Sequence, residues 1–254
     1  AESRMTACIS SQVGCSLSCK FCATGYMDRK RNLDPAEIYD QVVELNNQSM
    51  EAYDRPLSNI VYMGMGEPLL NYANMLKSVH HITSEEGLNM SPKRITVSTA
   101  GVAKMIKKLG DDEVKFNLAL SLHAANDQKR NQIMPINESN SLDALLEALK
   151  YYFAKTKNPV TYEYIVFNNF NDTLEDAEEL YRFTKHVPSK VNIIEYNPIE
   201  EADFMNTEED RLDRFADYLR NKGVNVYVRR SRGKDIDAAC GQLANRDKEK
   251  QAKA

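Results

Sequence analysis

The 254-residue sequence lacks several features, and each absence excludes a class of protein. No apolar run is long enough to span a membrane. Residues 1–6 contain no hydrophobic segment of the kind found in a secretory signal peptide. The formal net charge is −4, so no general coat of positive charge for nucleic acid is present. No linker or low-complexity stretch divides the chain, which favours one large α/β domain with a sizeable core.

Cysteine is scarce and odd in number. Four of the five cysteines lie within fifteen residues, at Cys8, Cys15, Cys19 and Cys22, and the fifth is Cys240. This distribution does not fit a secreted domain held together by paired disulfides. It indicates metal binding and thiol chemistry in a reducing compartment, and we expect the protein to be cytoplasmic.

Strand-like and helix-like segments alternate along the whole chain. The short β-branched runs are Thr6–Ser11, Asn59–Met65, Arg94–Thr99, Val114–Ser121, Val160–Phe167, Val191–Tyr196 and Val224–Arg230. The helical patterns are Pro35–Gln48, Tyr72–Glu86, Val102–Leu109, Leu142–Lys155, Leu174–His186 and Thr207–Lys222. Regular alternation predicts a parallel sheet with helices outside, but periodicity does not separate an open doubly wound sheet from a partial barrel.

Three of the clustered cysteines have the spacing C-x3-C-x2-C, at Cys15, Cys19 and Cys22. Three thiolates are one too few to close a tetrahedral metal site or a four-iron cluster. A [4Fe–4S] cluster held in this way keeps one iron open for an outside ligand. The alternatives are a zinc site, with Cys8 as a fourth ligand, and a redox thiol pair. No histidine lies within 50 residues of the triad to complete a zinc site.

Polar residues follow several predicted strands. Gly64, Gly66 and Glu67 come directly after one strand, where glycine lets a ligand approach the backbone closely. The other polar positions at strand ends are Ser98, Thr99, Ser121, His123 and Asn197. Carboxyl ends of parallel strands meet at one edge, so these groups are expected around one pocket. Each position alone would be an ordinary turn, cap or buried polar group.

Cys240 stands near the C-terminus in the run Ile236-Asp237-Ala238-Ala239-Cys240-Gly241-Gln242-Leu243. A lone late cysteine is usually a small buried hydrophobe. No core periodicity requires one here, and the preceding segment is basic, which favours a reactive thiolate.

Together these segments resemble the radical S-adenosylmethionine (SAM) enzymes known as dual-specificity 23S rRNA and tRNA adenine-2 methyltransferases. The resemblance runs from Arg4 to Leu243. Its most specific markers are the run from Cys8 to Cys15, Gly-Met-Gly-Glu-Pro-Leu-Leu-Asn from Gly64, Ser121-Leu122-His123, and the run that contains Cys240. It implies a partial (β/α)6 radical SAM barrel, with residues 1–243 as the methyltransferase core and residues 244–254 as a charged tail.

The resemblance also implies roles for individual residues. Cys15, Cys19 and Cys22 would hold the [4Fe–4S] cluster. The SAM site would be lined by Gly66, Glu67, Ser98, Ser121, Leu122, His123 and Asn197. Cys240 would carry a methyl group, and Cys8 would resolve the covalent enzyme–RNA intermediate by forming a disulfide with Cys240.

Such chemistry suits a carbon that cannot attack SAM itself. Carbon 2 of adenine is electron-poor, so the family uses two SAM molecules per turnover, one to methylate the cysteine and one to generate a radical. The implied substrates are 23S rRNA and tRNA, the implied reductant is a protein such as flavodoxin, and we expect a monomer without a membrane partner. A basic face of Arg29, Lys30, Arg31, Arg229, Arg230 and Arg232 would bind RNA with affinity that falls with salt.

Two departures and three alternatives accompany this interpretation. The family's small N-terminal RNA-binding domain and its proton-accepting glutamate are expected to precede residue 1. A related subgroup methylates carbon 8 and confers antibiotic resistance, but it typically has Ala where this chain has Pro68. The remaining alternatives are a non-catalytic iron–sulfur or zinc protein that binds RNA or a partner, and a radical SAM enzyme that catalyses another reaction.

Overall fold

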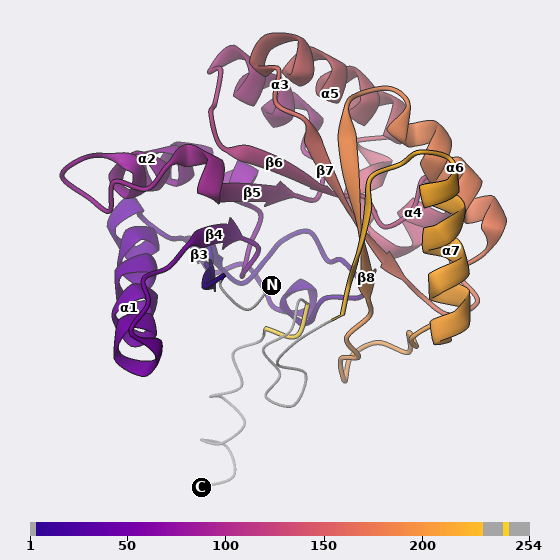
Figure 1. Ribbon diagram of the computed structural model, residues 1–254, viewed down its shortest axis with the longest axis horizontal. Coiled ribbons are helices and arrows are strands. Elements are labelled where there is room, and N and C mark those ends of the chain that lie inside the picture. Colours follow the sequence, from indigo (N-terminus) through magenta and orange to yellow (C-terminus); the bar gives the residue numbers. More distant parts are fainter. Residues whose placement is uncertain (1–3, 231–240, 244–254) are drawn as a thin grey trace, which may run out of the picture.

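The seven predicted strands form one parallel sheet in chain order. The computed structural model describes residues 4–230 and 241–243. The strands, listed across the sheet, are β1 (Thr6–Cys8), β4 (Asn59–Tyr62), β5 (Ile95–Thr99), β6 (Asn117–Ser121), β7 (Val160–Val166), β8 (Ser189–Glu195) and β9 (Val226–Arg229). β1 and β9 are the two edges of the sheet, which therefore does not close on itself. The sheet is curved, and together with its open side it forms a half-barrel (Figure 1). The predicted α/β class and the partial barrel are confirmed.

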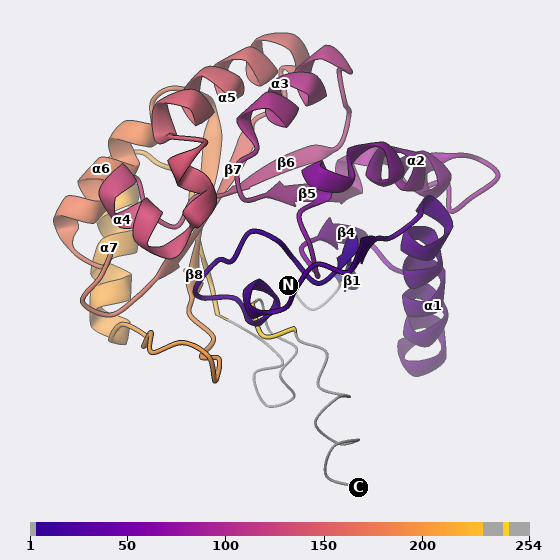
Figure 2. The ribbon, with the colours of Figure 1, turned by 180° about the vertical axis from the view of Figure 1, so that it is seen from behind.

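Helices cover the outer face of the half-barrel (Figures 1 and 2). They are α1 (Pro35–Tyr53), α2 (Tyr72–Thr83), α3 (Ala103–Asp111), α4 (Asp127–Ile133), α5 (Leu142–Thr156), α6 (Leu174–Thr184) and α7 (Glu209–Asn221). The 3-10 turns are η1 (Ala23–Tyr26), η2 (Pro68–Asn71), η3 (Pro92–Arg94) and η4 (Pro135–Glu138). Each strand of the seven-stranded sheet is connected to its parallel neighbour by a crossover that contains at least one of these helices, as the alternating sequence pattern predicts. No helix in the described ranges combines the length and apolarity needed to cross a bilayer.

Alternate residues of each strand face opposite sides of the sheet, and this alternation separates the core from the pocket. On β7, Tyr162 and Tyr164 point outward and pack against Phe183 and Phe215 of the helices. Glu163 and Ile165 therefore face the interior of the half-barrel. The outward side chains are fully buried and belong to the main core, whose burial supplies most of the driving force for folding.

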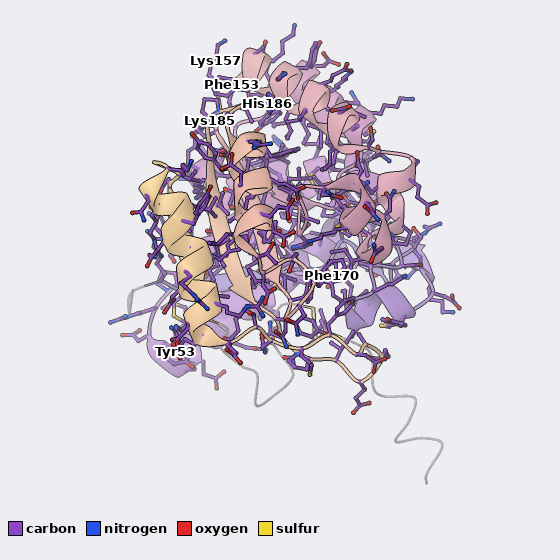
Figure 3. The ribbon with its side chains drawn as sticks, turned by 90° about the vertical axis from the view of Figure 1, so that its right-hand side faces the viewer. Tyr53, Phe153, Lys157, Phe170, Lys185 and His186 are labelled. Atoms are coloured by element: carbon purple, nitrogen blue, oxygen red, sulfur yellow. The ribbon has the colours of Figure 1, made fainter. Side chains whose placement is uncertain are left out.

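The helix starts follow local capping chemistry. Asp34 caps α1 in a reciprocal capping box with Glu37, as the Asp34-Pro35 pair indicates. The last helix begins two residues later than the sequence pattern suggests. Thr207 donates its hydroxyl to Asp172 at 2.7 Å, and Glu208 becomes the N-cap of α7. Figure 3 shows α6 and α7 side by side on the outer face, where Tyr218 of α7 donates to Glu178 of α6 at 2.8 Å.

The segment between β1 and α1 crosses the open side of the half-barrel toward β8 (Figures 1 and 2). Its base is a two-stranded antiparallel ribbon of β2 (Gln12–Val13) and β3 (Arg31–Asn32). The segment carries the cysteine triad, so the fold places these thiols over the carboxyl ends of the strands.

Candidate functional site

One cavity of about 340 Å³ lies at the carboxyl ends of the strands. This volume is typical of a small-molecule pocket. Its lining includes Cys15, Cys19, Cys22, Gly66, Glu67, Ser98, Ser121, His123, Glu163, Arg229 and Gly241. Residues from both ends of the described chain and from six strands or the loops after them, β4 to β9, therefore meet here.

Main-chain hydrogen bonds hold the cysteine loop over this cavity. The amide of Cys15 donates to the carbonyl of Met27, and the amide of Lys20 donates to Ile133 at the end of α4. Phe21, which lies between Cys19 and Cys22 in the sequence, has a buried side chain. Its ring lies edge-on to the ring of His123, with the two ring centroids 4.7 Å apart. The loop is thus anchored to the rim of the sheet at several points.

The three thiols of the cysteine loop lie close enough together to affect one another's charge. Burial raises the pKa of Cys19, and the nearby thiols of Cys22 and Cys15 raise it further. Repulsion among closely placed thiolates needs a compensating cation, which the irons of a cluster supply. Within the described residues, no three Cys, His, Asp or Glu side chains converge on one metal ion. A zinc ion and an iron–sulfur cluster both bind thiolates, so the metal content of the protein decides between them.

Glycine in the loop after β4 lets this loop pack closely against β2 of the ribbon. Gly66 has a φ of +91°, and a Cβ there would stand 2.4 Å from the Cβ of Gln12. The Gln12 side chain in turn accepts a hydrogen bond from the amide of Glu67 at 2.9 Å. The glycine therefore serves chain packing as well as access to the pocket.

Glu67 is buried in the pocket wall, and both of its carboxylate oxygens accept hydrogen bonds. Oε1 accepts from the amide of Leu69 at 3.0 Å, and Oε2 accepts from the amide of Ala100 at 2.8 Å. Burial raises the pKa of Glu67 to about 6, an effect that these amide donors oppose. The carboxylate thus ties the loop after β4 to the end of β5.

Of the residues expected at the ends of β5, β6 and β8, some line the cavity and others do not. Ser98 of β5 and Ser121 of β6 place their hydroxyl oxygens 3.4 Å apart on the pocket wall. Leu122 and Asn197 are buried beside the cavity and do not line it. Leu122 contributes its carbonyl, which accepts a hydrogen bond from Nε of Arg130 at 3.0 Å.

His123 stands at the end of β6 in a left-handed conformation, with a φ of +56°. Its Nδ1 accepts a hydrogen bond from the amide of Ile165 at 3.1 Å, so the ring is neutral with its proton on Nε2. Burial, together with the smaller effect of the positive charge of Arg130, lowers the pKa of His123 to about 3. His123 is therefore a neutral pocket residue.

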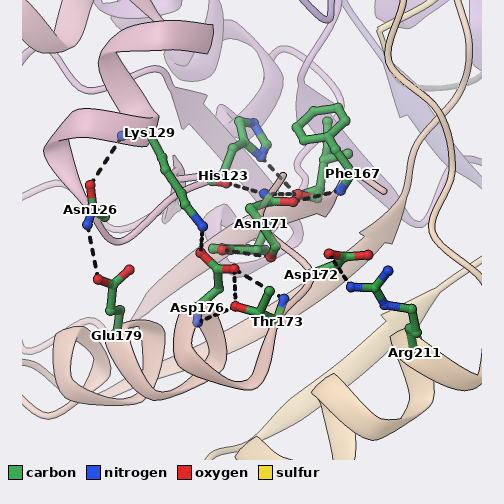
Figure 4. A network of polar contacts seen from close by, with 12 residues as sticks. His123, Asn126, Lys129, Phe167, Asn171, Asp172, Thr173, Asp176, Glu179 and Arg211 are labelled. Carbon is green, nitrogen blue, oxygen red and sulfur yellow. Dashed lines mark hydrogen bonds and ion pairs between the residues drawn. The ribbon is translucent and has the colours of Figure 1, made fainter. Parts of the chain in front are cut away.

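Asn171 fixes this turn from behind, as Figure 4 shows. Its Nδ2 donates to the carbonyls of His123 at 2.6 Å and Ile165 at 2.8 Å. Its Oδ1 accepts from the amide of Phe167 at 2.7 Å. One fully buried side chain thus joins the carboxyl ends of β6 and β7.

Of the two cysteines expected to perform thiol chemistry, the structure describes Cys8 but not Cys240. Cys8 ends β1 and remains accessible to solvent, while partial desolvation by the surrounding protein raises its pKa. Cys240 lies outside the described residues. The four described cysteines are free thiols, so the structure does not show the implied disulfide.

The chain that follows Cys240 docks against the cysteine loop. The amide of Ala23 donates to the carbonyl of Gly241 at 2.7 Å, and the hydroxyl of Thr24 donates to the carbonyl of Leu243 at 2.6 Å. Figure 1 shows this short yellow segment beside the coil that contains η1. Gly241 also lines the cavity.

Several residues of the expected basic face have acidic neighbours. Lys30 lies 3.6 Å from Asp28, and Arg31 forms an ion pair with Glu37 at 2.6 Å. Arg230 pairs with Glu209, and Arg232 lies outside the described residues. Exposed pairs of this kind contribute little stability, so phosphates can compete for these cations. The basic face remains a prediction.

Glu163 escaped the sequence analysis, which looked for pocket residues at strand ends, because it lies in the middle of β7. Arg229 ends β9 and was expected only on the basic face, but it also lines the cavity. The sequence does contain a signal for Glu163. A glutamate inside an otherwise apolar and aromatic strand, Val160–Val166, is costly to bury unless it has a function.

Comparison with known proteins places this geometry in a family. Residues 9–184 match the Radical SAM superfamily. The chain is 68% identical over 244 residues to a probable dual-specificity RNA methyltransferase RlmN from Cytophaga hutchinsonii, covering 96% of this chain and 67% of that protein. It is 61% identical to the corresponding Christiangramia forsetii protein, covering 96% and 70%.

A solved structure agrees with these sequence matches. The crystal structure of a radical SAM methyltransferase from Sphaerobacter thermophilus superimposes with a TM-score of 0.92 at 43% identity, covering 94% of this chain and 70% of that one. The chain belongs to the dual-specificity RNA methyltransferase RlmN family of radical SAM enzymes.

Proposed function

We propose that the protein methylates carbon 2 of an adenine in 23S rRNA and in tRNA, with Cys240 as the methyl carrier. The observation that carries the proposal is the meeting of three parts in one place. The cysteine loop, the polar strand ends and the chain that follows Cys240 all border one cavity. The names of the relatives, dual-specificity RNA methyltransferases, support the same activity.

Cys15, Cys19 and Cys22 would hold the [4Fe–4S] cluster, and residues of the cavity wall would hold SAM. When bound, cluster and SAM together supply a 5′-deoxyadenosyl radical. The wall residues that we propose for SAM are Gly66, Glu67, Ser98, Ser121 and His123, with Leu122 and Asn197 in support. The cysteine loop lines one side of the cavity above the strand ends, where it would limit the access of water to the reacting groups.

Cys240 and Cys8 would perform the thiol chemistry. The thiolate of Cys240 would take the methyl group of one SAM by displacement, and S-adenosylhomocysteine would leave. The methyl group would lose a hydrogen atom to the 5′-deoxyadenosyl radical, and its carbon would join the adenine ring with loss of one electron and the ring proton. The thiolate of Cys8 would then attack the sulfur of Cys240, so that the sulfur–carbon bond breaks, a disulfide forms, and the carbon takes up a proton as the methylated base is released. Cys8 suits this role because its thiol is accessible at the end of β1.

Partners and domain limits follow from the same proposal. We expect 23S rRNA and tRNA as substrates, a reductase such as flavodoxin as electron donor, and a monomeric protein. Residues 1–243 would form the catalytic core and residues 244–254 a charged tail. The basic residues Arg29 and Arg229, which have no ion-pair partner within the described chain, are the best candidates for phosphate contacts.

Mass spectrometry tests the proposal at its methyl carrier. The anaerobic protein with its cluster is incubated with methyl-labelled SAM and digested, and the Cys240 peptide is examined. We expect the label on Cys240 and no label in a Cys240→Ala variant. A cluster-bearing, SAM-binding protein that leaves Cys240 unlabelled would contradict the methyl-carrier role and favour another radical reaction.

A further inference from the structure

Glu163 is a buried carboxylate on the pocket side of the sheet. It lies at the centre of β7, is 4% exposed and lines the cavity. In register across the sheet it stands between Ser121 of β6 and Asn192 of β8. These three polar side chains form one row across the sheet, at the end of β6 and below the ends of β7 and β8.

Only one oxygen of this carboxylate is used within the protein. Oε1 accepts a hydrogen bond from Nδ2 of Asn192 at 2.7 Å. Oε2 is buried and has no hydrogen-bond partner among the described residues. Arg229 and Lys190 act on Glu163 only through their charges and do not bond to it. Glu67, the other buried carboxylate of the cavity wall, has both oxygens engaged.

An unpaired carboxylate oxygen in a buried wall costs folding free energy, because its hydration is lost and nothing replaces it. Because this oxygen lies at the wall of a cavity, water or a bound ligand is the partner that can complete it. The ligand must bring a hydrogen-bond donor, since an ionised carboxylate can only accept.

The side chains near Glu163 indicate which kind of hydrogen-bond donor the ligand would bring. The hydroxyls of Ser98 and Ser121, 3.4 Å apart, line the same cavity. Hydroxyls both donate and accept, so serines beside a carboxylate suit a vicinal diol, whose two hydroxyls also do both. The 6-amino group of an adenine is also a donor, so the test must separate a contact to the base from a contact to the ribose.

We propose that Glu163 binds the ribose of the SAM nucleoside, with Oε2 accepting a hydrogen bond from a ribose hydroxyl. Asn192 is the positioning residue, because its bond to Oε1 turns the second oxygen toward the cavity. This inference rests on the proposed function, which places SAM in this cavity. The adenosine of the RNA substrate also carries a ribose hydroxyl, so the test must separate the two sources.

The test compares SAM with its 2′-deoxy and 3′-deoxy analogues. Binding to the anaerobic, cluster-bearing full chain is measured by calorimetry without reductant, for the wild type and for Glu163→Gln. We expect the wild type to prefer SAM over at least one deoxy analogue by about tenfold or more, because hydrogen bonds to charged groups are strong. In Glu163→Gln, Asn192 keeps the amide oxygen and the NH2 group faces the cavity, so this preference should fall to about twofold or less.

A matched control comes from the opposite face of the same strand. The hydroxyl of Tyr162 is also buried without a partner in the described structure, but it points into the core. Tyr162→Phe should bind SAM and both analogues as the wild type does. Melting without SAM checks the fold, and Glu163→Gln should melt at or above the wild-type temperature because it removes a poorly solvated charge.

The outcomes separate the alternatives. Weaker SAM binding by Glu163→Gln with the deoxy preference intact would overturn the inference, as would unchanged SAM binding together with weaker binding of an adenosine-containing RNA hairpin. If the wild type binds SAM, either result would contradict the role of Glu163 and leave the proposed function of the protein untouched. If the wild type with its cluster binds no SAM, the proposed function fails and the inference fails with it.

Discussion

His123 is held through both its backbone and its ring. The left-handed φ places the ring against Phe21, and Nδ1 accepts the amide of Ile165. This bond requires the neutral imidazole, because protonation would turn the acceptor into a donor. The residue therefore couples the stability of the pocket wall to pH.

The sign of this coupling follows from the two pKa values. Burial lowers the folded-state pKa of His123 to about 3, whereas an unfolded histidine has a pKa of about 6.5. The unfolded chain therefore binds the extra proton below pH 6.5, and stability falls as the pH decreases from there toward 3. At pH 4.5 the loss from this one residue is about 2 to 3 kcal/mol.

His123→Asn tests this coupling. Asparagine tolerates a positive φ and offers an oxygen near the position of Nδ1, but it does not titrate. We expect the variant to be less stable than the wild type at pH 7, because it loses the contact with Phe21. Its unfolding free energy, measured in urea on the cluster-free protein, should fall less between pH 7 and pH 4.5. Parallel curves for the two proteins would contradict the account.

The residue scale also shows what the sequence could predict. The cysteine triad, Glu67 and the polar strand ends were found because residue type and spacing carry the signal. Glu163 was not found, because its importance depends on cross-strand register with Ser121 and Asn192, which a single strand does not reveal. Asn171 was missed for a similar reason, since its three partners lie on two other segments.

At the scale of elements, the loop after β7 acts as a clamp on the pocket rim. Figure 4 shows Asn171 between His123 and the end of β7, with Asp172 bound to Arg211 of α7 at 2.9 Å. The following residue, Thr173, caps α6 in a capping box with Asp176. Three consecutive residues thus join the pocket rim to two outer helices.

Asn171→Ala should weaken this clamp. It leaves the amide of Phe167 and the carbonyls of Ile165 and His123 without their partner in a fully buried place. The expected loss is about 2 to 4 kcal/mol, or about 5 to 15 °C in melting temperature. Asn168→Ala, in the same loop, is the matched control and should change stability by less than about 0.5 kcal/mol. Equal melting of the two variants would show that the clamp does not stabilise the fold.

Element predictions from the sequence succeeded where apolar periodicity was strong. All seven strands of the parallel sheet and six of the seven α-helices in the described residues were expected, with boundaries shifted by a few residues. The two-residue strands β2 and β3 of the ribbon were not expected. The exception among the helices, α4, is short, and its innermost residue is Arg130, which is fully buried and bonded to main-chain carbonyls at the ends of β5 and β6. A helix that buries an arginine has little apolar stripe for periodicity to detect.

At the scale of the whole molecule, chain-order pairing of the strands explains why one cavity collects residues from distant positions. The seven strands of the main sheet all run parallel, so their carboxyl ends reach the same rim. The N-terminal cysteine loop then crosses this rim, and residues 241–243 return to it from the other end of the chain. The sequence could not show this return, because no periodic pattern links the last residues to η1.

The measurement that tests the central claim most directly is the identity of the methylated nucleoside. The anaerobic protein, with its cluster and a reductant, is incubated with methyl-labelled SAM and unmodified 23S rRNA or tRNA, and the RNA is digested to nucleosides. The account predicts labelled 2-methyladenosine, absent with Cys240→Ala. Labelled 8-methyladenosine would show the carbon-8 activity instead, and cleavage of SAM without any label in RNA would contradict the proposed function.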